Sequence, residues 1–172
     1  MNPRQFKKQF ISDSTKIPLK PVGIVLHDTA TPGAPARNEW NFFEHHTATN
    51  AHAFIDDVED LQIVPWNIKC WHCGEPANSM FIGVEMCVPK THNPVFFNTV
   101  YWATVDAFAR LYRYVLNIKT VTKDNLMTHD EVRVKWKDTS HTDPTSYFKE
   151  YGKTIEQFRT DVQFSLDKKW TI

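Results

Sequence analysis

The sequence lacks an excess of charge of either sign. Its 20 lysine and arginine residues balance 20 aspartate and glutamate residues, so the formal net charge at pH 7 is +0. Proteins that bind nucleic acid or anionic membranes mainly by electrostatic attraction carry a broad basic surface. We therefore expect neither nucleic acid nor a membrane among the partners of this chain.

Long hydrophobic runs are also missing. The apolar stretches are short and broken by charged residues, so we expect no segment that spans a bilayer. The basic residues Arg4, Lys7 and Lys8 near the N-terminus have no apolar run behind them. A Sec signal peptide needs such a run. We therefore expect synthesis in the cytoplasm without Sec export.

Cysteine is scarce, with three residues in the whole chain, Cys70, Cys73 and Cys87. An odd number in a chain of this length does not fit a disulfide framework. Cys70 and Cys73 form a lone Cys-x-x-Cys, which is a weak zinc or redox signal, and two free thiols are the expected state. Cys87 lies in an apolar strand pattern, which favours a buried, inert thiol over a catalytic nucleophile.

The 172 residues, of which 41% are hydrophobic, are enough for one domain with a substantial core. Apolar patterns predict strands at 22–26, 51–57, 61–64, 81–87 and 126–128, and helices at 37–46, 99–117 and from 154 onward. We expect residues 1–20 to wrap the surface and 133–144 to form a loop. Strands that alternate with helices predict a single α/β domain over residues 1–172, with a central mixed β-sheet flanked by helices.

Three polar residues follow predicted strands or stand beside a proline. His27 closes the strand at 22–26, His129 follows the strand at 126–128, and Pro144 favours an extended backbone at Asp143. Two imidazoles and one carboxylate form the ligand set of a catalytic zinc site that keeps its fourth position open. From spacing alone, ordinary loop residues are the alternative. The sequence has no His-Glu-x-x-His motif, so a metalloprotease of that kind is unsupported.

Four segments in consistent order resemble the zinc amidase domain of phage endolysins and bacterial autolysins. The wider superfamily includes phage T7 lysozyme and the peptidoglycan recognition proteins. The segments read Ile-Val-Leu-His, Trp-His-Cys-Gly, Ile-Gly-Val-Glu and His-Thr-Asp-Pro, at 24–27, 71–74, 82–85 and 141–144. A closing turn and helix from 147 to 158 also match. The resemblance covers roughly residues 20–165, and it is to the autolysin-like branch in particular.

The resemblance implies an N-acetylmuramoyl-L-alanine amidase. Such an enzyme hydrolyses the amide between N-acetylmuramic acid and L-alanine of the stem peptide in bacterial peptidoglycan. By position, His27, His129 and Asp143 are implied as ligands of Zn²⁺, Glu85 as the general base, and His141 as the residue that stabilises the oxyanion. A glutamate in an apolar strand is costly to bury unless it is paired or functional. A salt bridge is the alternative for Glu85.

Three further residues are expected to contact the substrate. Trp71 and His72 are assigned to the groove, where Trp71 packs on a sugar or peptide face, while a structural role for His72 stays equally open. His52 lies near a position where many superfamily members have tyrosine, and whether it takes over that role also stays open. No cysteine follows Cys87, which favours Asp143 as the third ligand.

Two other functions fit parts of the pattern. A recognition module binds peptidoglycan without hydrolysis, but such modules lack the zinc ligands that are present here. An intracellular amidase that recycles soluble muropeptides would also lack a Sec signal. The resemblance to endolysins favours a protein made in the host cytoplasm that acts on the cell wall after release. We expect a monomer.

Overall fold

The computed structural model describes residues 4–46 and 50–168. Six strands form one sheet in the order β1-β4-β3-β5-β2-β6. Their bounds are Phe6–Lys8 for β1, Gly23–Asp28 for β2, Ala53–Ile55 for β3, Asp60–Gln62 for β4, Phe81–Met86 for β5 and Leu126–Thr128 for β6. The β3–β4 pair is antiparallel and the other pairs are parallel. This confirms the predicted mixed sheet.

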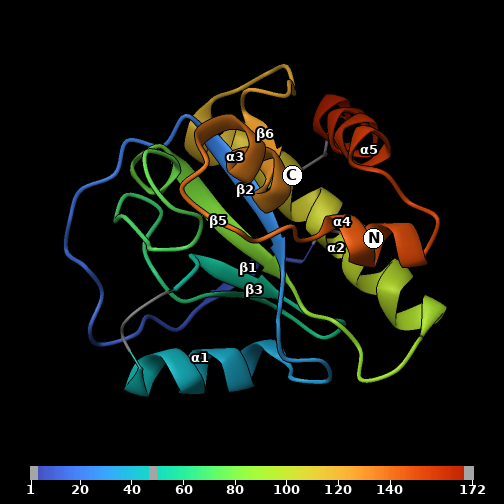
Figure 1. The fold of residues 1–172 in the computed structure, drawn as a ribbon, viewed down its shortest axis with the longest axis horizontal. Coiled ribbons are helices and arrows are strands. Elements are labelled where there is room, and N and C mark those ends of the chain that lie inside the picture. Colours follow the sequence, from blue (N-terminus) through green and yellow to red (C-terminus); the bar gives the residue numbers. More distant parts are fainter. Residues whose placement is uncertain (1–3, 47–49, 169–172) are drawn as a thin grey trace.

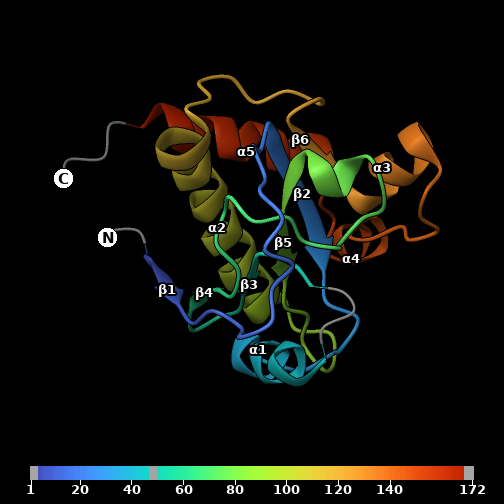
Figure 2. The same cartoon turned by 90° about the vertical axis from the view of Figure 1, so that its left-hand side faces the viewer.

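Helices cover both faces of the sheet (Figures 1 and 2). They are α1 (Ala36–His45), α2 (Pro94–Leu111), α3 (His129–Trp136), α4 (Thr145–Glu150) and α5 (Ile155–Asp167), with a short 3-10 helix η1 (Ala77–Ser79) and a π-helical turn η2 (Tyr112–Leu116). One face packs against α2 and α5 through a core that includes Ile24, Val84, Phe108 and Phe158. On the opposite face, α1 covers β3 and β4, while α3 and the η1 segment cover β2, β5 and β6.

Local sequence accounts for where the longest helix begins and ends. The side chain of Asn93 accepts a hydrogen bond from the backbone N–H of Phe96, and Pro94 occupies the first turn, where it costs no hydrogen bond. The helix therefore begins before the predicted residue 99. It continues through η2 and ends at Asn117, whose φ of 53° is the left-handed conformation common after helices. The helical prediction for 99–117 is thus confirmed, with an earlier start.

The N-terminal segment does more than wrap the surface. Residues Phe6–Lys8 add β1 to the sheet beside β4, and this corrects the expectation for residues 1–20. Just before this strand, Nη2 of Arg4 lies 2.7 Å from Oδ1 of the buried Asp60. Nη2 of Arg110 lies 2.5 Å from Oδ2 of the same side chain. Three residues are too few to show the alternation that marks a strand, so the sequence pattern missed it.

Helix α3 replaces the first part of the loop that was predicted at 133–144. Thr128 accepts a hydrogen bond from the backbone N–H of Glu131, and the Glu131 carboxylate accepts one from the N–H of Thr128. This reciprocal capping box stabilises a short helix. The helix buries His129 and Val132 but is otherwise polar, so it lacks the apolar periodicity on which the prediction relied.

Two further expectations concern membranes and thiols. Across residues 4–46 and 50–168, no helix combines the length and apolar character needed to cross a bilayer. All three cysteines are free and buried. Burial raises the pKa of the Cys87 thiol well above its ordinary value, as an inert thiol requires.

Candidate functional site

The parallel register of the sheet aligns four residues in one row. His27 of β2 pairs with Glu85 of β5, and Glu85 pairs with Phe54 of β3. On the other side of β2, Leu26 pairs with Thr128, so the next residue, His129, arrives beside His27. Successive side chains in a strand point to opposite faces. Because Leu26 packs under α2, His27 and Glu85 point to the face that α2 and α5 leave uncovered.

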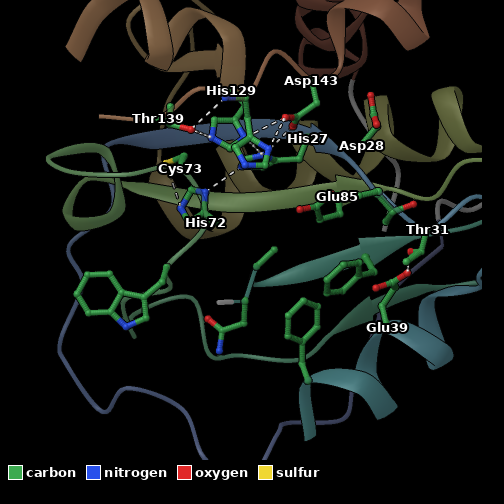
Figure 3. A pocket seen from close by; sticks show the side chains of 18 of the residues that line it. His27, Asp28, Thr31, Glu39, His72, Cys73, Glu85, His129, Thr139 and Asp143 are labelled. Carbon is green, nitrogen blue, oxygen red and sulfur yellow. Dashed lines mark hydrogen bonds and ion pairs between the residues drawn. The ribbon is translucent and has the colours of Figure 1, made fainter. Parts of the chain in front are cut away.

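His27, His129 and Asp143 converge at one end of this row (Figure 3). Nδ1 of His27 lies 3.1 Å from Nδ1 of His129 and 3.0 Å from Oδ2 of Asp143. Nδ1 of His129 lies 3.0 Å from Oδ1 of Asp143. In a tetrahedral zinc site with bonds of about 2.0–2.2 Å, ligand atoms lie about 3.3–3.6 Å apart. A small outward movement of these side chains therefore makes room for a metal ion, and the donor set fits zinc.

The protonation states of two of these residues also suit metal binding. Burial lowers the pKa of His27, which favours the neutral imidazole. Burial alone raises the pKa of Asp143, but hydrogen bonds and charge interactions with His129 and His27 outweigh it, so the pKa lies well below its ordinary value. Metals bind neutral imidazole and ionised carboxylate.

Both ligand histidines have a partner on the nitrogen that faces away from the cluster. Nε2 of His27 lies 2.9 Å from Nδ1 of His72, whose Nε2 lies 3.2 Å from the carbonyl oxygen of Phe81. Nε2 of His129 lies 2.8 Å from Oγ1 of Thr139. The sequence reasoning missed Thr139, because a threonine in a polar loop carries no signal until its neighbours in space are known.

Glu85 lies beside the ligand cluster, with a buried oxygen. Among the described residues, no hydrogen-bond partner lies within reach of its Oε2 atom, and no lysine or arginine pairs with it. The salt bridge that was the alternative for this residue is therefore not found in that part of the chain. Burial, followed by the negative charge of Asp143, raises the pKa of Glu85 well above its ordinary value. Such a carboxyl group is suited to take up a proton.

His141 lies at the rim of the cluster. Its side chain is 70% exposed, and its ring stacks on that of His129 with centroids 4.9 Å apart and planes 2° apart. Nδ1 of His141 lies 4.0 Å from Oδ1 of Asp143. The structure thus brings all five predicted metal-binding and catalytic residues to one place.

These residues line one end of a cleft of about 620 Å³. At the other end, Phe42, Phe43 and Phe54 provide an apolar wall beneath α1. Trp71 lies on the cleft wall, with the Lys69 ammonium 4.0 Å from its ring centroid. The cleft therefore offers polar chemistry at one end and an apolar surface at the other, as a substrate with both kinds of group requires.

His52 does not take part in this cleft, and the expectation that it contacts the substrate is corrected. It is fully buried, and it does not line the cleft. The backbone N–H of Gly83 donates to its Nδ1 at 3.0 Å, and its Nε2–H donates to the carbonyl oxygen of Ile68 at 2.9 Å. Both ring nitrogens are occupied, so the residue ties β5 to the segment that follows β4.

The mixed sheet and the converging imidazole and carboxylate donors define an α/β protein with three side chains at the end of a cleft that could hold a metal ion. The chain belongs to the N-acetylmuramoyl-L-alanine amidase family, whose sequence profile matches residues 18–146. This range holds all of the row across the sheet and the three clustered donors.

Two relatives show how far the sequence similarity extends. Protein Ami of Listeria monocytogenes is 32% identical over 143 residues, which cover 81% of this chain and 16% of that protein. A probable N-acetylmuramoyl-L-alanine amidase of Bacillus licheniformis is 29% identical over 163 residues, covering 86% of this chain and 42% of that protein. The chain thus spans less than half the length of these two relatives.

Solved structures share the fold. The Staphylococcus aureus hydrolase AmiA, in complex with its ligand, superposes with a TM-score of 0.88 at 22% identity, covering 96% of this chain and 85% of that one. PlyL superposes with a TM-score of 0.73 at 24% identity, covering 95% and 98% of the two chains. At this level of identity the likeness establishes the architecture.

Proposed function

We propose that this chain is the catalytic domain of a peptidoglycan hydrolase. It hydrolyses the amide bond between N-acetylmuramic acid and L-alanine of the stem peptide. One observation carries the proposal above the others. In a chain of the amidase family, the ligand atoms of His27, His129 and Asp143 converge beside a carboxyl oxygen of Glu85 that has no hydrogen-bond partner among residues 4–46 and 50–168.

We propose that His27, His129 and Asp143 hold Zn²⁺ and leave its remaining position directed into the cleft. Two nitrogen donors and one oxygen donor match the catalytic class of zinc sites, whereas structural sites close all four positions with protein ligands. Zinc at this centre supplies a Lewis acid that polarises a carbonyl and lowers the pKa of water.

Glu85 acts as the general acid–base. Its side chain leaves the same face of the sheet as that of His27, and its buried oxygen is free of competing protein contacts within the described chain. It accepts a proton from the attacking water and delivers it to the nitrogen of the leaving L-alanine. A raised proton affinity assists the first transfer.

His141 supports the developing negative charge on the scissile carbonyl oxygen. Its exposed ring, stacked on His129, reaches the cleft without being held by another side chain at hydrogen-bond distance among residues 4–46 and 50–168. A donor in this position stabilises an oxyanion more than the neutral carbonyl. We assign Trp71 to contact with the sugar or peptide, since it forms the cleft wall away from the ligands.

The proposal is tested by identifying which bond of the cell wall the protein hydrolyses. Purified protein is incubated with cell walls, with and without a chelator, and new N-terminal alanine and new reducing sugar ends are counted. We expect N-terminal alanine that disappears with the chelator and returns with zinc. New reducing ends would indicate a glycosidase, and binding to the walls without any new ends would indicate a recognition module.

Two parallel substrates refine the assignment. Intact sacculi and soluble anhydro-muropeptides are compared at equal concentrations of the amide bond. Preference for sacculi supports a wall-lytic enzyme that acts on the cell wall after release, which we propose here, whereas preference for the soluble compounds supports a recycling enzyme. Sedimentation of the same preparation tests the proposed monomer.

A further inference from the structure

The segment from Cys70 to Pro76, between β4 and η1, contributes no ligand to the metal centre, yet it contacts the far side of His27 directly and is linked to that of His129 through Asp138 and Thr139. We propose that His72 and Thr139 are positioning residues: they hold His27 and His129 in the tautomer that presents Nδ1 to the metal, and the 70–76 segment fixes both of them. This inference rests on the metal centre of the proposed function. It gives His72, which also lines the cleft, a role beside the expected contact with substrate.

The tautomer of His27 is set by His72, whose own tautomer is set by the carbonyl oxygen of Phe81. The carbonyl oxygen of Phe81 can only accept, so Nε2 of His72, at 3.2 Å, carries a hydrogen and donates it. Nδ1 of the neutral His72 ring is then an acceptor. It takes the hydrogen from Nε2 of His27 at 2.9 Å, which leaves the lone pair of His27 on Nδ1, among the other ligand atoms.

The His72 ring is held in place from two directions. The side-chain oxygen of Asn78 accepts hydrogen bonds from the backbone N–H groups of His72 and Cys73, both at 2.9 Å. On the sheet, Gly83 lies beneath the ring, and a Cβ atom at that position would stand 2.6 Å from Cγ of His72. The absence of a side chain at Gly83 therefore makes the space that the ring occupies.

The other ligand histidine is held through the loop after α3. Oγ1 of Thr139 lies 2.8 Å from Nε2 of His129, and the hydroxyl accepts that hydrogen, which leaves Nδ1 of His129 free for the metal. The hydroxyl also accepts a weaker hydrogen bond from the backbone N–H of His141 at 3.3 Å. Figure 3 shows Thr139 above and His72 below, both on the side of the ligand cluster that faces away from Asp143.

The 70–76 segment also places Thr139. The backbone N–H of Glu75 donates to Oδ2 of Asp138 at 2.6 Å. Gly74, with a φ of +82°, approaches so closely that a Cβ atom would lie 2.7 Å from the carbonyl oxygen of Asp138. In this segment, His72 therefore contacts His27 directly. Gly74 and Glu75 contact Asp138, and the neighbouring Thr139 contacts His129.

The experiment measures zinc affinity by competition with a chelator and does not depend on substrate. In His72→Asn the amide oxygen takes the place of Nδ1 and still accepts from His27, although the contact with Phe81 is lost. In His72→Gln the amide takes the place of Nε2 and keeps that contact, but no acceptor faces His27. We expect His72→Asn to bind zinc nearly as the unaltered protein does, and His72→Gln to bind it about 10–100-fold more weakly.

A second matched pair tests the other histidine. Thr139→Ser keeps the hydroxyl, whereas Thr139→Val keeps the shape and removes it. We expect normal affinity in the first variant and a loss of about tenfold or more in the second. His52→Asn serves as a control, because His52 is a buried histidine of the same region whose ring nitrogens hydrogen-bond to backbone groups and not to His27 or His129. It is expected to lower stability while the folded protein keeps its zinc affinity.

Equal zinc affinities in His72→Asn and His72→Gln would overturn the role of His72, and equal affinities in the Thr139 pair would overturn that of Thr139. Should these variants fail to fold, nitrogen NMR of the zinc-loaded, unaltered protein decides, since hydrogen on Nδ1 of His27 or on Nδ1 of His72 contradicts the inference. Zinc binding without wall hydrolysis would overturn the proposed function alone. An unaltered protein that binds no zinc would overturn both.

Discussion

His27 and Glu85 are register partners in the parallel pair β2–β5, and their side chains leave the same face of the sheet. This relationship places a carboxyl group next to the imidazole that we propose as a metal ligand, and both are held by strands of the sheet. Both positions lie in paired six-residue strands whose other residues are mostly buried, which makes the pair a rigid part of the site. Strand β6 then places His129 beside this fixed edge, and the loop after α3 brings Asp143 and His141 to it.

Glu85→Gln separates catalysis from metal binding. The amide is nearly the size of the carboxyl group but cannot accept the proton, so we expect kcat to fall by about 10²–10⁴-fold while fold and zinc affinity persist. Kinetics on cell walls and chelator competition measure the two quantities. Glu44→Gln, in α1 and outside the lining of the cleft, is the control. Full activity in Glu85→Gln would remove the residue from the mechanism.

Removal of a proposed zinc ligand is expected to abolish metal binding as well as catalysis, unlike the substitution at Glu85. His27→Ala and Asp143→Ala each leave only two of the three converging donors, so we expect both bound zinc and turnover to be lost. Metal analysis after gel filtration gives the zinc content per chain. A variant that kept its zinc at full occupancy would show that the deleted residue is not a ligand.

His52 makes stability depend on pH. Burial lowers its pKa from 6.5 to about 4 in the folded protein, so the unfolded chain binds the extra proton first. Its contribution is complete above pH 6.5 and is lost as the pH falls towards 4, by up to about 3 kcal/mol. Urea unfolding of the metal-free protein at pH 7 and pH 4.5 measures this. His52→Gln is less stable at pH 7 and should show a smaller fall; equal falls in both proteins would contradict the prediction.

The Arg4–Asp60–Arg110 cluster anchors β1 to the rest of the sheet. The Asp60 side chain is fully buried between two arginines, and its removal leaves positive charges without a partner. We expect Asp60→Ala to lower the free energy of unfolding by about 3–5 kcal/mol. Asp124→Ala breaks the exposed contact with Lys135 and should cost at most about 1 kcal/mol. Denaturant unfolding compares the two, and similar losses would show that burial of the cluster is unimportant.

Gly74 and Gly152 form a matched test of the 70–76 segment. Both have positive φ, of +82° and +67°, so alanine at either position carries a backbone cost of about 1–2 kcal/mol. At Gly74 the new Cβ also meets the Asp138 carbonyl, whereas at Gly152 nothing lies within 4 Å. We expect both variants to lose stability but only Gly74→Ala to lose zinc affinity. Unchanged zinc affinity in Gly74→Ala would show that the 70–76 segment does not hold His129 in place.

Much of the architecture could be predicted because its signals are local. The apolar runs at 22–26 and 81–87 correspond to β2 and β5, and the capping residue Thr154 lies directly before α5, where its side chain accepts from the N–H of Gln157. Strand burial and helix capping depend on residues that are neighbours in sequence. β1 was missed because three residues are too few to show an alternating pattern of apolar side chains. α3 was missed because it buries only two side chains and therefore shows no helical period of apolar residues.

The sequence by itself determined the kinds of chemical group in the site and their order along the chain: two imidazoles, two carboxylates and a third histidine at the ends of predicted strands and loops. Only the tertiary structure decided what each histidine does. His27, His52 and His72 have similar apolar surroundings in sequence, yet one faces the metal cluster, one binds two backbone groups and one supports another histidine. The reason is physical, since the role of an imidazole depends on the partner of each ring nitrogen, and these partners come from distant parts of the chain.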